Sequence, residues 1–289
     1  MANITDSRLP DFLICGAQRG GTTALYHYLR SHPQVYMPGK KELHFFDQNY
    51  HRGLKWYSRF FKQTCRDGCI VGEATPSYMY LEEVPQRIKR VLPDVKLIFV
   101  LRHPVDRAYS HYWLEVRLGL EPLSFEEALL KEPRRLATGS LFNRIHYSYI
   151  DRGRYAAQLE RFLKLFPRRN IFVATHRELR SNPADLLARI SRFLGIDHRY
   201  WENHAFTRGY NVGRSPRSWG IHRAGVTIAR RLGHSPPGIL LRLGLMLLNT
   251  KRGYPPMRSG TRRMLLNHYK AWNKKLEKML GLELDWWYR

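Results

Sequence analysis

A glycine-rich segment near the N-terminus, residues 16–23, has residue types suited to binding a phosphate. Its sequence is GAQRGGTT, and it follows an apolar run, Phe12–Cys15, that is typical of a buried strand. Thr22 and Thr23 then begin a segment with the apolar spacing of an amphipathic helix. A strand, a glycine-rich turn and a helix N-terminus direct backbone N–H groups and the positive end of the helix dipole at one point. The two hydroxyls and the Arg19 guanidinium add charge-assisted donors, so the segment is predicted to bind a phosphate group.

This loop departs from the pattern of a nucleoside-triphosphate P-loop. That pattern, G-x-x-x-x-G-K-[ST], has a lysine after its last glycine that contacts the β- and γ-phosphates. Gly16 and Gly21 have the required spacing, but Thr22 stands at the lysine position and Arg19 is the only cation in the loop. The dinucleotide pattern G-x-G-x-x-G is absent. A P-loop kinase acting on nucleotides or small molecules stays an alternative, which magnesium-dependent ATP turnover would support; a plain tight turn is the structural alternative.

A second candidate element, LIFVLRHPVDRAYS, covers residues 97–110. Arg102 follows a buried strand, at the edge where open α/β sheets bind ligands, and Ser110 lies on the helix expected next. A guanidinium and a hydroxyl on either side of one turn can bind a phosphate monoester, because the arginine fork is bidentate and always charged. A surface residue at a strand end is the alternative for Arg102. Arg107 could be a ligand contact, a helix-surface residue or a partner of Asp106.

Residues 41–47, KELHFFD, supply candidates for proton transfer. Glu42 and His44 are able to take a proton from a hydroxyl or an amine, and the neighbouring aromatic residues would exclude water. Asp47 could be a third member of the group or a helix cap. A glutamate in a basic segment is more often a salt-bridge partner, so the residues alone leave the role of Glu42 open.

Together these segments resemble the sulfotransferases that use 3′-phosphoadenosine-5′-phosphosulfate (PAPS). Their 5′-phosphosulfate loop reads roughly G-x-[QR]-[KR]-[GS]-G-T-[ST], which residues 16–23 match, with Arg19 where the glycan-modifying branch usually has lysine. Residues 40–61 resemble the heparan-sulfate branch, especially its N-sulfotransferase domain. Residues 97–112 resemble the 3′-phosphate element of the family. Further similarity, in FLGI and in the ending NKKLEKMLGLELDWW, extends the resemblance over nearly the whole chain except a weak stretch at about 211–249.

The resemblance implies three groups of residues that would bind PAPS. Two would hold its phosphate groups, and the third would close over its 3′-phosphate and adenine. The residues of the 5′-phosphosulfate loop are Arg19, Gly20, Gly21, Thr22 and Thr23; those of the 3′-phosphate element are Arg102 and Ser110; those of the closing loop are Lys251, Arg252, Gly253 and Tyr254. An ordinary basic turn before the last helix is the alternative for the closing loop.

The resemblance also implies a mechanism, in-line displacement at sulfur. Glu42 matches the family's base and would remove the proton of the acceptor, while His44 would orient Glu42 or the acceptor. Arg19 and the loop amides would stabilise charge on the leaving 5′-phosphate oxygen, without a metal ion, and the products would be a sulfated acceptor and adenosine 3′,5′-bisphosphate. One departure is Ala74, which stands where glycan sulfotransferases often have a lysine; it weakens the expectation of a specifically heparan-type substrate.

The composition agrees with an anionic ligand. The chain has 289 residues, with 49 Lys and Arg against 24 Asp and Glu, which gives a formal net charge of +25. Such a charge attracts nucleotides, anionic glycans, nucleic acids and acidic membrane surfaces. An anionic glycan is the expected partner. A basic nucleic-acid-binding protein stays a further alternative, although no recognised nucleic-acid-binding motif is present.

Cysteine content and hydropathy suggest a cytoplasmic enzyme without a metal site. Cys65 and Cys69 could pair, but no nearby histidine or cysteine completes a zinc site. The N-terminal sequence MANITDSRLPD lacks the features of a signal peptide. The longest apolar run, Gly238–Leu248, contains Arg242 and is too short to span a bilayer. The oligomeric state cannot be inferred.

Alternating strand and helix patterns predict an α/β fold with a central parallel sheet flanked by helices. One P-loop-like domain is expected over residues 1–289, with 211–256 as a basic lid or acceptor-binding insertion, or else a plain packing helix. The expected strands are 12–15, 69–73, 95–101 and 170–175, and the expected helices include 85–92, 125–130, 154–166 and 183–194.

Overall fold

Five parallel strands form the central sheet of the protein. The computed structural model describes residues 8–61, 69–206, 213–233 and 235–288. The strands stand in the order β2-β3-β1-β4-β5, and all their pairings are parallel. Their bounds are β1 Phe12–Gly16, β2 Val35–Tyr36, β3 Ile70–Ala74, β4 Lys96–Leu101 and β5 Ile171–Thr175. This sheet confirms the predicted α/β class, and it adds β2, which the sequence did not indicate.

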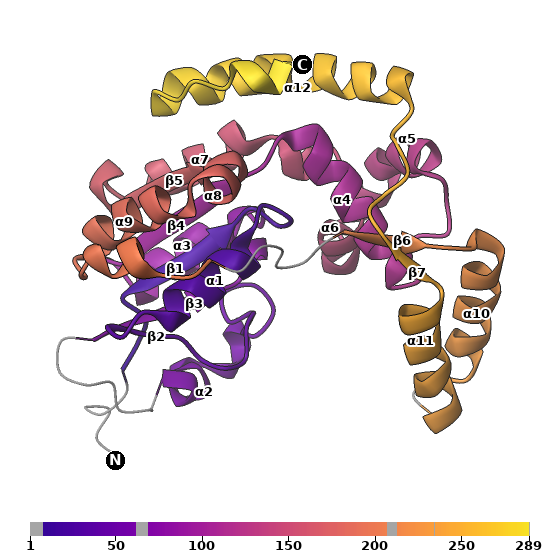
Figure 1. Cartoon of the computed structure of the whole chain (residues 1–289), viewed down its shortest axis with the longest axis horizontal. Coiled ribbons are helices and arrows are strands. Elements are labelled where there is room, and N and C mark those ends of the chain that lie inside the picture. Colours follow the sequence, from indigo (N-terminus) through magenta and orange to yellow (C-terminus); the bar gives the residue numbers. More distant parts are fainter. Residues whose placement is uncertain (1–7, 62–68, 207–212, 234, 289) are drawn as a thin grey trace. The chain divides into compact units, whose positions relative to one another are not determined.

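Helices separate the strands along the chain (Figure 1), as the long crossovers between parallel strands require. The helices are α1 Thr22–Ser31, α2 Leu54–Ser58, α3 Val84–Val91, α4 Pro104–Arg117, α5 Phe125–Leu136, α6 Leu141–His146, α7 Tyr155–Leu163, α8 His176–Ser181, α9 Pro183–Leu194, α10 Trp219–Arg231, α11 Pro236–Leu248 and α12 Ser259–Leu280. The helix predicted over 183–194 coincides with α9. It begins at a proline after the capping residue Asn182 and ends before Gly195, which has a φ of 82°.

The chain forms two compact units, each described here by itself. The first unit comprises Met1–His103, Arg154–Tyr210 and Trp272–Leu284. The second unit comprises Pro104–Gly153, Asn211–Ala271 and Asp285–Arg289. The first unit therefore contains the whole parallel sheet, and the second contains the segment 211–256. The role of that segment as a lid or acceptor-binding insertion stays a prediction.

The core of the first unit forms between the sheet and its helices. β1 is buried along its whole length and β4 is buried after Lys96, as expected for parallel strands that are covered on both faces. Leu25, Tyr28 and Leu29 of α1 enter this core, together with one side of α9. Their spacing is the helical one that the sequence predicted. Because this apolar face fixes α1 against the sheet, it also fixes the N-terminus of the helix at the end of β1.

In the second unit, α5 is longer than predicted. The sequence predicted a helix over 125–130, but α5 continues to Leu136 with Pro133 inside it. Its start is held by a capping box between Ser124 and Glu127. The buried Glu132 carboxylate accepts the N–H groups of the next segment, at residues 150 and 151 (2.7 and 2.8 Å). Glu132, the residue before the proline, is thus joined to a segment outside the helix.

Two helices and a two-stranded antiparallel sheet make up most of the segment 211–256. The strands are β6 Arg214–Pro216 and β7 Thr250–Arg252, and α10 and α11 lie between them in the chain. The apolar stretch that the sequence showed before residue 249 is α11. Searching the described residues finds no helix that is both long and apolar enough to cross a membrane. The possible pairing of Cys65 with Cys69 involves Cys65, which lies outside the described residues.

Gly72 tests how tightly the central strands pack. A Cβ at this position of β3 would lie 2.1 Å from the ring of Phe12 on β1. Gly72→Ala is therefore expected to lower the free energy of unfolding by roughly 1–3 kcal/mol, measured by urea denaturation. Gly220→Ala in α10 is the control, because a Cβ there has nothing within 4 Å; its stability should be unchanged or slightly higher. Unaltered stability of Gly72→Ala would contradict this account of the packing.

Candidate active site

The glycine-rich loop connects the end of β1 to the start of α1. The Ala17 N–H donates to the carbonyl oxygen of Val100 on β4 (2.9 Å), and the Gly20 N–H donates to the Ala17 carbonyl oxygen (2.8 Å). A Cβ on Gly20 would lie 2.2 Å from that Val100 oxygen, so this position needs glycine. Gly21 has a φ of 107°, in the left-handed region that favours glycine. The loop is thus folded closely onto the sheet edge.

The N-terminus of α1 is suited to an anion. Gly21 is its N-cap, no side chain caps the helix, and its first turn has no acidic residue. The first N–H groups of a helix have no partner within it and carry partial positive charge. The structure brings Gly20, Gly21, Thr22 and Thr23 together here, with the Thr22 side chain buried. Thr22, rather than a lysine, begins the helix, which distinguishes this loop from a nucleoside-triphosphate P-loop.

Two of the predicted cations lie at this loop. Arg19 has a φ of 67° within the turn. The Arg102 guanidinium donates to the Arg19 carbonyl oxygen (3.4 Å), and the Arg102 carbonyl oxygen accepts the hydroxyl of Tyr155 (2.9 Å). Arg102 follows the last residue of β4, as the sequence predicted. The first unit therefore places the Arg102 guanidinium against the backbone of the loop that leads into the uncapped N-terminus of α1.

The candidate proton-transfer segment crosses the carboxyl end of β3. The Glu42 N–H donates to the Ala74 carbonyl oxygen (3.1 Å), and the His44 N–H donates to Oγ1 of Thr75 (3.4 Å). Glu42 and His44 have φ values of 62° and 54°. Positive φ is uncommon for residues other than glycine, and it costs of the order of 1 kcal/mol or more at each position. Two such residues separated only by Leu43 point to a functional segment.

Glu42, His44 and Asp47 form a chain of charged contacts. His44 Nδ1 lies 2.9 Å from Asp47 Oδ2, and His44 Nε2 lies 3.7 Å from Glu42 Oε2. The buried Asp47 also accepts the hydroxyl of Ser77 (2.5 Å). Of the two interpretations of Asp47 that the sequence allowed, the structure shows the partner of His44. Ser77 was not singled out from the sequence, because nothing in a serine after a proline indicates a carboxylate partner so far along the chain.

These contacts shift two pKa values in opposite directions. Burial raises the pKa of Glu42, but the hydrogen bond with His44 and the charge of Lys41 outweigh burial and lower that pKa from 4.5 to about 2. Burial lowers the pKa of His44, but the hydrogen bonds with Asp47 and Glu42 raise it from 6.5 to about 9. At neutral pH Glu42 is therefore ionised and His44 is protonated. The group carries an ion pair.

A buried carboxylate supports this segment from below. Glu73 on β3 accepts hydroxyl groups from Tyr57, Thr75 (2.6 Å) and Tyr78 (2.9 Å). Burial raises the pKa of Glu73 above 4.5, although these hydroxyls oppose the shift. The Tyr78 hydroxyl also accepts the N–H of Phe45 (2.8 Å). Sequence reasoning missed this network, which couples the backbone of the Glu42 segment to β3.

Ala74, which stands where glycan sulfotransferases often have a lysine, is an apolar residue at the end of β3. Its side chain is buried, and its carbonyl oxygen accepts the Glu42 N–H. The cation that contacts Glu42 comes instead from Lys41, whose Nζ pairs with Glu42 Oε1 and whose side chain is 16% exposed. A positive charge is thus present beside the candidate base, but it comes from a different element.

In the second unit, Ser110 and Tyr254 come together. Their hydroxyl oxygens lie 3.2 Å apart, and the Tyr254 ring stacks on Trp113 with a centroid distance of 5.9 Å. The Tyr109 hydroxyl donates to the Pro255 carbonyl oxygen (3.0 Å). These contacts hold the segment after β7 against α4. They bring together a member of the predicted 3′-phosphate element and a member of the predicted closing loop.

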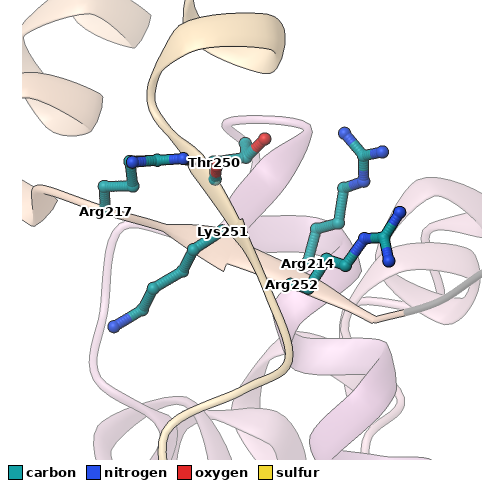
Figure 2. Close-up of a pocket in the computed structure, with 5 residues that line it drawn as sticks. All are labelled: Arg214, Arg217, Thr250, Lys251 and Arg252. Atoms are coloured by element: carbon teal, nitrogen blue, oxygen red, sulfur yellow. Dashed lines mark hydrogen bonds between the residues drawn. The ribbon is translucent and has the colours of Figure 1, made fainter.

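The remaining residues of the closing loop lie on or directly after β7. We call the antiparallel pair β6 and β7, whose strands are joined by α10 and α11, the cationic hairpin. β6 and β7 pair so that Arg214 is opposite Arg252 and Ser215 is opposite Lys251. Figure 2 shows Arg214 and Arg252 extending to one side of the strands and Lys251 to the other. Gly253 follows with a φ of 86°. The hairpin lines a cavity of about 350 Å³ whose residues are Arg214, Arg217, Thr250, Lys251 and Arg252.

Two of the roles that the sequence left open for Arg107, a surface residue and a partner of Asp106, are wrong. The Arg107 side chain is fully buried and donates to the Tyr149 carbonyl oxygen, so it is neither a surface residue nor a partner of Asp106. Asp106 pairs with Arg262 instead (2.9 Å). An arginine one helical turn after a proline has no sequence signal for burial.

In the described residues, no group of three or more His, Cys, Asp or Glu side chains could hold a metal ion.

Comparison with known proteins identifies the family of this chain. The model of the sulfotransferase domain family matches residues 9–208. The chain belongs to the sulfotransferase family. The matched range includes the glycine-rich loop, the Glu42 segment, Arg102 and Ser110, so the resemblance inferred from these motifs is confirmed. The hairpin and helices after residue 208 lie outside that range.

Named sulfotransferases are similar over most of the chain. Heparan sulfate glucosamine 3-O-sulfotransferase 3B1 of mouse is 32% identical over 96% of this chain, and the chain spans 65% of its length. The human bifunctional heparan sulfate N-deacetylase/N-sulfotransferase 3 is 33% identical over 99% of this chain, which spans 32% of that protein. A solved sulfotransferase from Alicyclobacillus acidocaldarius has a TM-score of 0.72 and 27% identity, with 98% of this chain and 100% of that one covered.

The ion pair in this sulfotransferase predicts an unusually basic histidine. NMR titration of the imidazole signals, with His44 assigned by their loss in His44→Gln, should give a pKa near 9. Asp47→Asn should lower the pKa of His44, because burial lowers this pKa and the variant lacks the Asp47 charge that opposes burial. The raised pKa of His44 favours folding below about 6.5 and loses this effect as pH rises through 9, whereas the lowered pKa of Glu42 favours folding above 4.5 and loses it as pH falls towards 2. A wild-type His44 pKa of 6.5 or below would contradict the contact.

Proposed function

We propose that this protein transfers a sulfuryl group from PAPS to a hydroxyl or amine of an acceptor, with an anionic glycan as the favoured acceptor. The observation that carries the proposal is the uncapped N-terminus of α1, folded against Val100 by Gly20 and flanked by Arg19 and Arg102. A phosphate group is the ligand that such an arrangement binds best. Membership of the sulfotransferase family makes PAPS the donor expected there.

The residues of the loop fit this donor. A side chain at Gly20 would fill the space against the sheet, and the absence of acidic residues in the first turn of α1 leaves the positive end of its dipole uncompensated. Gly20, Gly21, Thr22 and Thr23 would hold the 5′-phosphosulfate. When bound, PAPS supplies an activated sulfuryl group on a phosphate leaving group. Arg19 would stabilise negative charge at the loop, where a fixed cation acts without reorganisation.

The family resemblance assigns the 3′-phosphate to Arg102 and Ser110. The Arg102 guanidinium offers a fork of donors, and Ser110 offers a hydroxyl. Lys251, Arg252, Gly253 and Tyr254 would close over the adenine and this phosphate. Support comes from the contact between Ser110 and Tyr254 and from the cationic hairpin that Lys251 and Arg252 share.

Glu42 is the proposed base and His44 its positioning residue. The Asp47 carboxylate holds His44 Nδ1, which leaves Nε2 directed at Glu42. The Glu42 carboxylate is ionised and 41% exposed, so it can accept a hydrogen bond from an incoming hydroxyl or amine. The aromatic residues beside it, Phe45 and Phe46, are buried and keep water from the inner side of the segment.

An anionic glycan is the acceptor class that the chain supports best. The relatives named above act on heparan sulfate according to their names, and this chain spans only 65% of the length of the mouse 3-O-sulfotransferase. The net charge of +25 favours an anionic partner. Ala74 removes a lysine expected of glycan-modifying enzymes, and Lys41 offers a cation nearby. The cytoplasmic location that the sequence suggested stays a prediction.

Nucleotide affinity tests the donor. The protein is expected to bind adenosine 3′,5′-bisphosphate roughly 10- to 150-fold more tightly than 5′-AMP by calorimetry, because charge-assisted hydrogen bonds are worth ~1.5–3 kcal/mol. Arg102→Gln should remove most of this difference. The exposed Arg90→Gln on α3 is the matched control and should preserve it. Equal affinities of the wild-type protein for both nucleotides would overturn the proposed function.

Turnover tests the base. Glu42→Gln keeps the shape of the side chain but removes the proton acceptor, so the sulfation rate should fall by roughly 10²- to 10⁴-fold while the affinity for adenosine 3′,5′-bisphosphate stays unchanged. The exposed Glu202→Gln serves as the control. The assay follows sulfated products by mass spectrometry over a panel of glycans, lipids and small alcohols. Turnover within a few-fold of wild type would place the base elsewhere, with His44 the next candidate.

A further inference from the structure

A long stretch of the chain carries positive charge without any carboxylate. Between Glu202 and Glu277 the sequence has 15 Lys and Arg residues and no Asp or Glu. This stretch includes the cationic hairpin and the helices α10 and α11, all in the second unit. The excess of charge in the whole protein is therefore concentrated in a region that has no carboxylate of its own. Within it, Arg262 and Lys275 pair with carboxylates of other segments, Asp106 (2.9 Å) and Glu160 (2.7 Å).

The same region exposes apolar side chains on both of its helices. On α10, Ile221 and Ile228 lie two turns apart on one face and are 60% and 49% exposed. A neighbouring side of α10 is fixed to the unit, because the buried His222 Nε2 lies 2.7 Å from the Val116 carbonyl oxygen. The isoleucines are therefore on the face that the unit leaves uncovered.

α11 is more apolar still. Its sequence is PPGILLRLGLMLL, in which Arg242 is the only polar side chain. A helix that is apolar all round is normally buried. Here Leu240 is 67% exposed and Leu248, two turns later, is 79% exposed. Leucines of α1 and α9 enter the core instead. Leu130 on α5 is as exposed (81%), but it belongs to a helix that also carries charged residues.

The two features together restrict what can cover this surface. A second copy of the chain would bring two carboxylate-free cationic regions together, which is unfavourable. A sulfated glycan would neutralise the charge but leave the apolar side chains in water. An anionic lipid surface satisfies both, because acyl chains receive the apolar side chains and headgroups attract the cations. We propose that α10 and α11 bind in the interface of an anionic lipid bilayer.

Exposed arginines next to these apolar side chains would contact the anionic headgroups. Arg223 and Arg231 on α10 are exposed, as are Arg214 and Arg252 of the hairpin. Arg214 and Arg252 stand directly opposite one another across β6 and β7. Like charges in this position repel, so a bound anion between them lowers the energy of the hairpin. Helices of this kind lie in the plane of the interface and do not cross the bilayer.

Vesicle co-sedimentation of the full chain tests this interaction. The protein should bind vesicles of phosphatidylcholine mixed with phosphatidylglycerol, and binding to phosphatidylcholine alone should be much weaker. The triple variant Ile221→Ser, Leu240→Ser, Leu248→Ser should reduce binding to the mixed vesicles by at least about tenfold. The matched control replaces three exposed leucines elsewhere, Leu54→Ser, Leu130→Ser and Leu141→Ser, and should bind as the wild type does.

Three outcomes would overturn the proposal: no binding to the mixed vesicles, equal binding to both vesicle types, or unchanged binding of the triple variant. A concentration-dependent dimer that disappears in the triple variant, seen by analytical ultracentrifugation, would assign the surface to a second copy instead. If the triple variant fails to fold, Leu248→Ser alone at the end of α11 gives the same comparison. The inference is independent of the proposed function, because affinity for adenosine 3′,5′-bisphosphate is measured without lipid.

Discussion

The close contact between Gly20 and the Val100 carbonyl oxygen is the constraint on which the site depends. With a Cβ 2.2 Å from that oxygen the loop could not reach the sheet, and α1 would begin farther from the ends of β1 and β4. Folded as it is, the loop presents an uncapped helix N-terminus at the edge where Arg102 emerges from β4. The Arg102 guanidinium and the helix dipole are then both at this loop, which is the electrostatic basis of the proposed phosphate binding.

The same sheet edge also fixes the proton-transfer group. β3 is the parallel neighbour of β1, so the carboxyl ends of both strands lie at one edge of the sheet. The segment that hydrogen-bonds to Ala74 and Thr75 is therefore at the same edge as the glycine-rich loop. The buried Glu73 and its three hydroxyl donors hold that segment through Tyr78. Such a network offsets the cost of two residues with positive φ, Glu42 and His44. The positive φ values of Glu42 and His44 are tolerated because Glu73 and its hydroxyl donors hydrogen-bond to one another and, through Tyr78, to this segment.

The sequence allowed the sheet and the phosphate loop to be predicted, because strand, glycine and helix signals are local. The helix α9 was predicted to the residue, since proline and glycine mark its ends. Long-range contacts could not be predicted. The link from Ser77 to Asp47 spans 30 residues, and the burial of Arg107 depends on Tyr149, 42 residues away. The contact between Glu132 of α5 and Ile150, 18 residues away, is likewise one that no local pattern reveals.

The charge state of the proton-transfer group sets a condition on its chemistry. A carboxylate with a pKa of about 2 is a weak base, since efficient general bases have pKa values near the operating pH. The low value arises from His44 and Lys41, both of which pair with Glu42. An acceptor hydroxyl that hydrogen-bonds to Glu42 competes with these cations, and each contact that it displaces raises the basicity of the carboxylate. Because Asp47 retains its hold on His44 Nδ1, the imidazole can release Glu42 without losing its own charge partner. In the proposed mechanism, binding of the acceptor and activation of Glu42 as the base would thereby be coupled within one short segment.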